Sequence, residues 1–117
     1  MVQFQIKRIY DDAAKPDGLR VLVDRLWPRG VKKADAHVDE WEKGVAPSLE
    51  LRKWWDHDPE RMDEFADKYR AELDDSDAVD SVLQLAKGHK KVTLLYAAKD
   101  PKVNHARILR DYLAEYA

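Results

Sequence analysis

A short segment directly after an apolar run concentrates side chains that can bind an anion, residues 24–30. An arginine guanidinium is planar and donates paired hydrogen bonds to a phosphate or a carboxylate. A tryptophan ring stacks on a flat ligand, and a glycine lets the backbone approach a ligand closely. We therefore predict that this segment contributes four ligand-binding residues, Arg25, Trp27, Arg29 and Gly30.

A second segment, residues 96–105, carries a complementary set of polar groups. Asn104 is a suitable N-cap for a final helix, and a helix N-terminus presents free N–H groups and the positive end of its dipole to an anion. We expect Tyr96, Lys99 and Asn104 to contribute to ligand binding with the first segment.

Asp24 and His105 form the candidate catalytic pair. A histidine near a helix N-terminus favours the neutral imidazole, which can act as a base, an acceptor or a ligand, and an aspartate can orient it. No nucleophile lies beside the two in the sequence, so a catalytic triad is not supported. The structural alternatives stay open: Asp24 pairing with a neighbouring cation, Trp27 filling the core, and His105 capping its helix or bonding a carbonyl.

No metal or cofactor is expected. Histidines and aspartates occur close together in two places, but neither place has the spacing of known metal ligands. The two groups are His57 and Asp58 with His105, and His37 with Asp35 and Asp39.

Two apolar runs predict the strands that position these segments. Residues 19–23, interrupted only by Arg20, and residues 92–98 are typical of strands buried on both faces of a sheet. Residues 2–10 alternate, with Val2, Phe4, Ile6 and Tyr10 on one face, which predicts a half-buried strand. If the two buried strands run parallel, both polar segments open on the same edge of the sheet, where ligands bind in α/β folds.

Helices are predicted between and after the strands. Ser48 is a suitable N-cap for residues 49–55, and Asp58 followed by Pro59 starts a helix whose apolar stripe runs to Leu73. Further helices are expected at residues 78–87, ended by Gly88, and from Asn104 onward. Weaker signals indicate a helical turn at 31–36 and a short strand at 37–41. The predicted fold class is α/β: a small, mainly parallel sheet of three or four strands flanked by helices, in a single domain over residues 1–117. Strand order and the direction of the first strand stay open.

Composition narrows the function classes. The chain has 117 residues, a net charge of -2 and no cysteine. The acidic balance disfavours a nucleic-acid or membrane-surface binder, and the missing thiol excludes disulfides and cysteine nucleophiles. No signal peptide or membrane-spanning run is recognised, so a cytoplasmic location is expected. Nothing in the sequence indicates the oligomeric state.

Four groups of residues carry a recognisable pattern: residues 20–30 (Arg-Val-Leu-Val-Asp-Arg-Leu-Trp-Pro-Arg-Gly), Trp41 with 46–48, 51–54 with 57–59, and 94–100 with 104–106. They resemble the DUF488 family of unknown function, and within it the short YeaO-like branch. The resemblance implies a small α/β domain in which both polar segments belong to the family pattern. Other DUF488 branches carry Cys-His-Arg where this chain has Asn104-His105-Ala106, so a thiol-dependent role does not transfer.

Two functional hypotheses follow. The first is a pocket for a small anion, phosphate or nucleotide-like, at the carboxyl edge of the strands, in a protein that is either an enzyme or a binder. The alternative is a non-catalytic binding or regulatory module that uses the same pocket or a tryptophan-rich surface around Trp41, Trp54 and Trp55.

Overall fold

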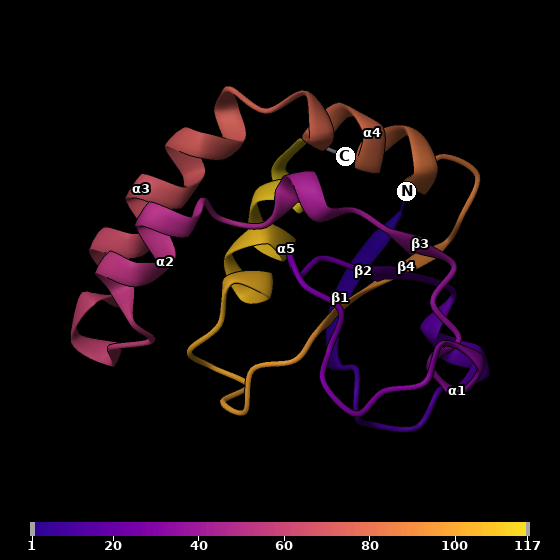
Figure 1. The fold of residues 1–117 in the computed structure, drawn as a ribbon. Coiled ribbons are helices and arrows are strands. Elements are labelled where there is room, and N and C mark those ends of the chain that lie inside the picture. Colours follow the sequence, from indigo (N-terminus) through magenta and orange to yellow (C-terminus); the bar gives the residue numbers. More distant parts are fainter. Residues whose placement is uncertain (1, 117) are drawn as a thin grey trace.

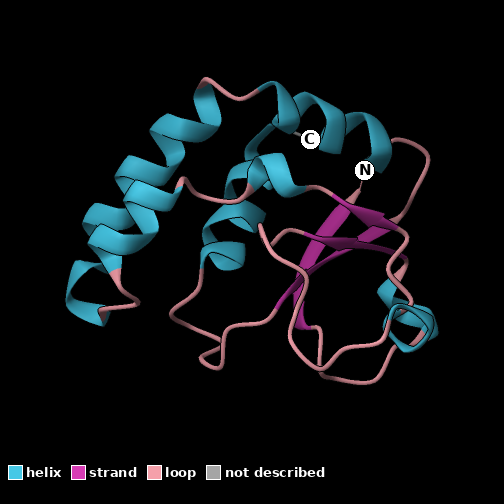
Figure 2. Ribbon diagram, in the orientation of Figure 1, coloured by secondary structure: helices cyan, strands magenta, loops and turns pink. Residues whose placement is uncertain are grey.

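A four-stranded parallel sheet forms the centre of the computed structural model, which describes residues 2–116 (Figures 1 and 2). Its strands are β1 (Gln3–Arg8), β2 (Leu19–Leu22), β3 (Glu40–Trp41) and β4 (Lys91–Tyr96). They are arranged in the order β1-β4-β2-β3, and every neighbouring pair is parallel. The predicted α/β class is confirmed, and the first strand, whose direction the sequence left open, runs parallel to β4.

The helices divide unequally between the two faces of the sheet. One face is covered by α2 (Leu49–Trp55), α3 (Met62–Asp74), α4 (Asp77–Ala86) and α5 (His105–Tyr116), and the short α1 (Lys33–Ala36) lies on the opposite side (Figure 2). Three short 3₁₀ turns complete the chain: Lys15–Asp17, Lys43–Val45 and Pro59–Arg61.

Side chains of the central strands alternate between two hydrophobic clusters. Val21 and Leu94 belong to the large cluster under α2–α5, whereas Leu22 and Leu95 belong to a small cluster with Ala36 of α1. Because both faces are covered, β2 and β4 carry apolar residues on both faces rather than on one, as expected for central parallel strands.

The local signals at helix starts were mostly accurate. The Ser48 hydroxyl accepts a hydrogen bond from Leu51 N–H at 3.2 Å, so it caps α2 as predicted. The Asp58 carboxylate likewise accepts from Glu60 N–H, but the proline that follows begins a 3₁₀ turn, and α3 starts only at Met62. The first strand ends at Arg8, so Tyr10 lies outside it with 45% of its surface exposed.

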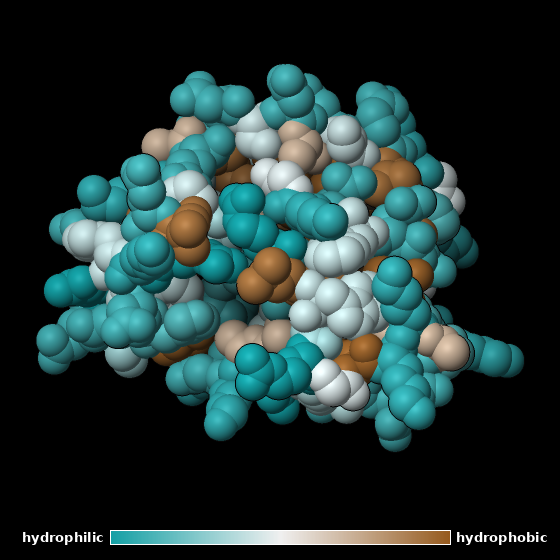
Figure 3. All heavy atoms as spheres, viewed as in Figure 1, coloured by the Kyte–Doolittle hydropathy of each residue, from teal (hydrophilic) through white to brown (hydrophobic). Residues whose placement is uncertain are grey.

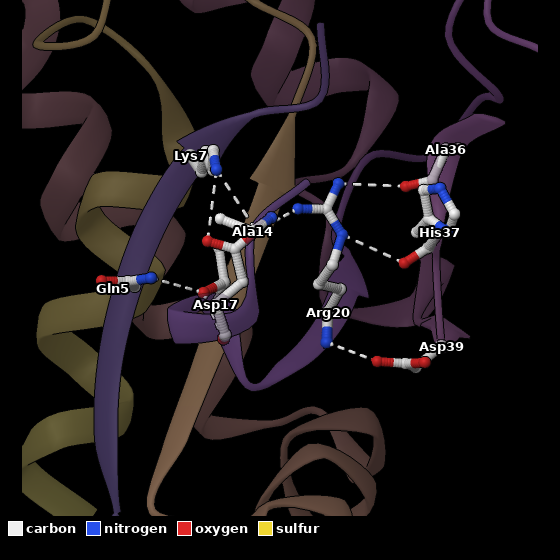
Figure 4. A network of polar contacts seen from close by, with 9 residues as sticks. Gln5, Lys7, Ala14, Asp17, Arg20, Ala36, His37 and Asp39 are labelled. Atoms are coloured by element: carbon white, nitrogen blue, oxygen red, sulfur yellow. Dashed lines mark hydrogen bonds and ion pairs between the residues drawn. The ribbon is translucent and has the colours of Figure 1, made fainter. Parts of the chain in front are cut away.

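Arg20, the one charged residue within the β2 run, is buried against the small-cluster face of the sheet (Figure 4). Its guanidinium pairs with the buried Asp17 carboxylate and donates to the Ala36 and His37 carbonyls at 3.0 Å each. Its backbone N–H donates to Asp39 Oδ2 at 2.8 Å. This one side chain therefore fixes the turn before β2 and the segment between α1 and β3.

The partners of Asp17 offset the cost of burying its charge. Burial raises the pKa of the carboxyl, but hydrogen bonds from Ala14 N–H, Lys7 and Arg20 outweigh it and hold the pKa below its ordinary value. Asp17 therefore stays ionised and paired at neutral pH.

Replacing Arg20 by methionine is expected to destabilise the protein by about 3–5 kcal/mol, because the buried Asp17 carboxylate loses one charged partner and two carbonyls lose a donor. Urea unfolding followed by circular dichroism measures this loss. The exposed Arg107→Met is the control and should shift stability by no more than about 0.5 kcal/mol. A loss below about 1 kcal/mol in Arg20→Met would contradict the role given to this network.

Candidate functional site

A cleft of about 540 Å³ opens at the carboxyl ends of β2 and β4, between the loop after β2 and the end of α2. Figure 3 shows a hollow near the centre of one face, with a few hydrophobic residues scattered among hydrophilic ones. Two walls bound the cleft: the β2 loop, residues 24–28, and the α2 wall, residues 49, 52, 53 and 55–57. The remaining lining residues are Ala46, Pro47, Ala97, Ala98 and His105.

Asp24 joins the elements that meet at this edge. Its Oδ2 accepts a hydrogen bond from Ala97 N–H at 2.9 Å, just beyond the end of β4. Its carbonyl oxygen accepts from Trp41 Nε1 at 2.8 Å, at the end of β3. Its second carboxylate oxygen, Oδ1, lies 3.3 Å from Nε2 of His105 in α5 but outside hydrogen-bond geometry. The carboxylate is therefore a junction between strands and helix.

His105 is buried at the first position of α5 and contacts the end of β2. Its Nε2 lies 3.0 Å from the Val23 carbonyl oxygen. Because a carbonyl only accepts, this contact assigns a proton to Nε2, so a neutral ring has the Nε2–H tautomer. One of the open alternatives, a histidine that bonds a carbonyl, is thus observed, in addition to the approach to Asp24.

Burial dominates the titration of this pair. It lowers the pKa of His105 from its ordinary value, although the Asp24 charge and the Val23 carbonyl act in the opposite direction. It raises the pKa of Asp24, against the charges of His105, Arg52 and His57 and the Ala97 hydrogen bond. The neutral imidazole is favoured in the folded state, so the His105 contribution to stability is lost as the pH falls below about 6.5. The Asp24 contribution has the opposite sign, because folding disfavours its ionised form and protonation removes that cost.

The α2 wall brings further charge to the cleft. Arg52 and Lys53 follow Leu49 by three and four residues, and Asp56 follows them by four and three, so the four residues share one side of the helix. Arg52 is close enough for its charge to lower the pKa of both Asp24 and His105. Among residues 2–116, no carboxylate or carbonyl accepts a hydrogen bond from its guanidinium, and this cation is available to a ligand.

Stacked rings hold the α2 wall in place. The Trp55 ring lies 3.8 Å from that of Phe65 in α3, nearly parallel, and 4.5 Å from that of His57. Trp55 is 1% exposed, and its Nε1 has no acceptor within the part of the chain that the structure describes. The turn after α2 is unusual, since Asp56 and His57 both have positive φ, 49° and 54°. Non-glycine residues adopt this conformation at a cost and often do so at functional sites.

Four of the nine predicted site residues line this cleft: Asp24, Arg25, Trp27 and His105. The Arg25 guanidinium donates to the Pro47 carbonyl at 3.3 Å, which ties the β2 loop to the segment before α2. Trp27 Nε1 donates to the Val31 carbonyl at 2.7 Å, and its ring packs edge-on against Trp41.

The structure does not bring the other five predicted residues to the lining of this cleft. Arg29 is exposed, and Gly30 borders a separate hollow beside Tyr10 and His37. Tyr96 is buried in the large hydrophobic cluster, and Lys99 lies on the exposed loop that follows. Asn104 is fully buried, where its Oδ1 accepts from Arg107 N–H at 2.9 Å and so caps α5. That cap uses one of the helix N–H groups expected to face a ligand.

Sequence reasoning missed the α2 wall. Arg52, Lys53 and His57 were not predicted to bind a ligand, because they lie far in sequence from both polar segments. Beyond the helix prediction, Arg52 and Lys53 entered only through the family resemblance, and His57 also through a possible metal group. A signal existed in the spacing of Arg52 and Lys53 from Leu49, but it does not reveal what that helix side faces.

Two classes of site or segment are not found within residues 2–116. No group of three or more histidine, cysteine or acidic side chains lies close enough to hold a metal ion. None of the helices there has the length and apolar character needed to cross a membrane.

Fold and cleft together define a small α/β protein with a cleft at the carboxyl edge of a parallel sheet. The chain belongs to the DUF488 family: the family model described as "Inactive DUF488-N3 subclade" matches residues 3–117. This confirms the resemblance found in the sequence.

The relatives cover nearly the whole chain. An uncharacterized protein of Mycobacterium bovis is 46% identical over 109 residues, which are 93% of this chain and 92% of the relative. The uncharacterized protein YeaO of Escherichia coli K12 is 44% identical over 112 residues, 96% of this chain and 97% of YeaO. No solved structure matches the chain.

The electrostatic coupling of Asp24 and His105 can be measured directly. Replacing Asp24 by asparagine removes the negative charge that supports the imidazolium, so we expect the pKa of His105 to fall further below its ordinary value. Histidine ring NMR against pH, with His105→Gln used to assign the signal, measures both pKa values. The His89→Gln variant is the control and should leave the His105 titration unchanged. A rise of the His105 pKa in Asp24→Asn would contradict the placement of the pair.

Proposed function

We propose that the protein binds a small anion in the cleft between the β2 loop and the α2 wall, and that it does so without chemical conversion. The observation that carries this proposal is the presence of Arg25, Arg52 and Lys53 around one cleft. Arginine suits phosphate or carboxylate because its donors match the geometry of paired oxygens.

Arg52 is central to the proposal. It is half-buried, and its charge lowers the pKa of both Asp24 and His105. No acceptor within residues 2–116 takes a hydrogen bond from its guanidinium. Asp24 does not offset this cation fully, since its carboxylate is turned to Ala97 N–H and His105. An anionic ligand on the α2 wall would complete the charge balance of the cleft.

Several observations favour binding over catalysis. His105 commits its Nε2 proton to the Val23 carbonyl, and Asp24 commits one oxygen to Ala97 N–H. The lining residues, all within the described chain, carry no hydroxyl or thiol nucleophile. The position at which other DUF488 branches carry a cysteine is Asn104, whose side chain caps α5. The family description also contains the word "Inactive".

Acid–base catalysis is the second candidate, because the Asp24 and His105 side chains approach to 3.3 Å at the edge of the cleft. It requires the ring to exchange a proton with a bound ligand through Nδ1. The tryptophan-rich surface is less favoured, since Trp55 is buried and Trp41 donates to the Asp24 carbonyl.

Thermal shift against inorganic phosphate, adenosine monophosphate and benzoate tests the proposal. A ligand present at about 100 times its Kd adds about 2.7 kcal/mol to the stability of the folded state. For a chain of this size that raises Tm by roughly 10 °C. We expect Arg52→Gln and Arg25→Ala to lose most of the shift.

Arg110→Gln is the matched control, because Arg110 is another half-buried helical arginine and pairs with Asp111 outside the cleft. It should keep the full shift. A shift of equal size in Arg52→Gln, Arg25→Ala and the unchanged protein would place anion binding elsewhere. Turnover of a bound phosphate ester that disappears in His105→Gln would favour the catalytic candidate instead.

A further inference from the structure

Two large hydrophobic side chains stand exposed on opposite walls of the cleft. Leu26 of the β2 loop is 69% exposed, and Leu49 at the start of α2 is 50% exposed. Only two other large hydrophobic residues within the described chain are comparably exposed, Tyr10 and Tyr116, and neither lines this cleft. A single exposed leucine is ordinary, but two on facing walls of one cleft form an apolar surface whose removal from water by a ligand is favourable.

The cleft also has other apolar lining residues. Pro28, Ala46, Ala97 and Ala98 line the cleft together with the Trp55 ring. The cations, by contrast, come from the α2 wall and from Arg25. The cleft therefore offers charge and apolar surface together, and its volume of about 540 Å³ exceeds what an inorganic anion fills.

We infer that the ligand is an organic anion whose phosphate or carboxylate is attached to an apolar body of about the size of an aromatic ring. The anionic group is held by Arg52 and its neighbouring cations, and the apolar body is covered by Leu26 and Leu49. This inference rests on the proposed function and adds the chemical class of the ligand.

The charge balance also limits the number of anionic groups. Asp24 and Asp56 line the same cleft as Arg25, Arg52 and Lys53. A single phosphate or carboxylate suits the resulting small excess of positive charge, whereas a polyphosphate chain would bring its outer charges against apolar surface or carboxylates. The class is therefore a monoanionic or dianionic organic acid rather than a nucleoside triphosphate.

Isothermal titration with matched pairs of probes tests this class. Phenyl phosphate is compared with inorganic phosphate, and benzoate with acetate, so the two head groups are separated from the contribution of the ring. Burying most of a phenyl group stabilises a complex enough for about tenfold tighter binding or more. We expect the aryl probe to bind more tightly than its partner for at least one head group. We expect adenosine triphosphate to bind no better than phenyl phosphate.

Serine variants of the two leucines connect the preference to the cleft. Leu26→Ser and Leu49→Ser should each reduce affinity for the aryl probe about threefold or more, and leave affinity for the inorganic or acetate probe unchanged. Tyr116→Ser removes an exposed hydrophobic residue elsewhere and should change neither affinity. Since all three side chains are exposed, the variants are expected to fold, and their melting temperatures check this.

The outcomes separate the two proposals. Equal affinity for the paired probes, lost in Arg52→Gln but unaffected in the leucine variants, would overturn this inference and leave anion binding intact. A preference for aryl probes that survives both leucine substitutions would also overturn it. If no probe binds, or if binding is unaffected by Arg52→Gln and Arg25→Ala, the proposed function fails first.

Discussion

The carboxyl edge of the sheet depends on how one partly buried residue, Asp24, is held. Asp24 accepts a hydrogen bond from Ala97 N–H after β4 and, through its carbonyl, from Trp41 Nε1 at the end of β3. His105 brings the start of α5 against the same carboxylate. Since burial raises the pKa of Asp24, its ionised form costs folding free energy, which His105 and the Ala97 hydrogen bond offset only in part. The polar contacts of Asp24 therefore join β3, β4 and α5 at the edge of the cleft.

Arg20, near the start of β2, is a second charged side chain whose burial must be balanced by polar partners. Its guanidinium bonds to Asp17 and two carbonyls and is buried, so it is not accessible to a ligand. Arg52, in contrast, has no such partner within residues 2–116. The two arginines show how burial and partners, rather than residue type, separate a structural cation from a candidate binding one.

Features that depend on short segments of the chain were predicted correctly from the sequence. Ser48 caps α2, the β-branched run around Val21 forms a central strand, and both are properties of short segments. Parallel pairing of β2 and β4 then brings Asp24 and His105 together, as the edge rule for parallel sheets predicts. Gly30 and Lys99 follow the same strands, but their loops turn away from the cleft, and loop direction is not encoded in residue type.

The α2 wall was missed for a different physical reason. Its place over the strand edge is set by the stack of Trp55 on Phe65, a contact between two helices that no local pattern specifies. Once that stack seals the inner side of α2, the side that carries Leu49, Arg52 and Lys53 borders the cleft. The same packing leaves His57 beside Trp55, on a backbone with positive φ. The strained turn after α2 and the lining residues of α2 therefore have the same structural cause. Helix packing thus places the α2 wall at the cleft, and strand pairing places the Asp24–His105 pair there. The binding that we propose depends on both.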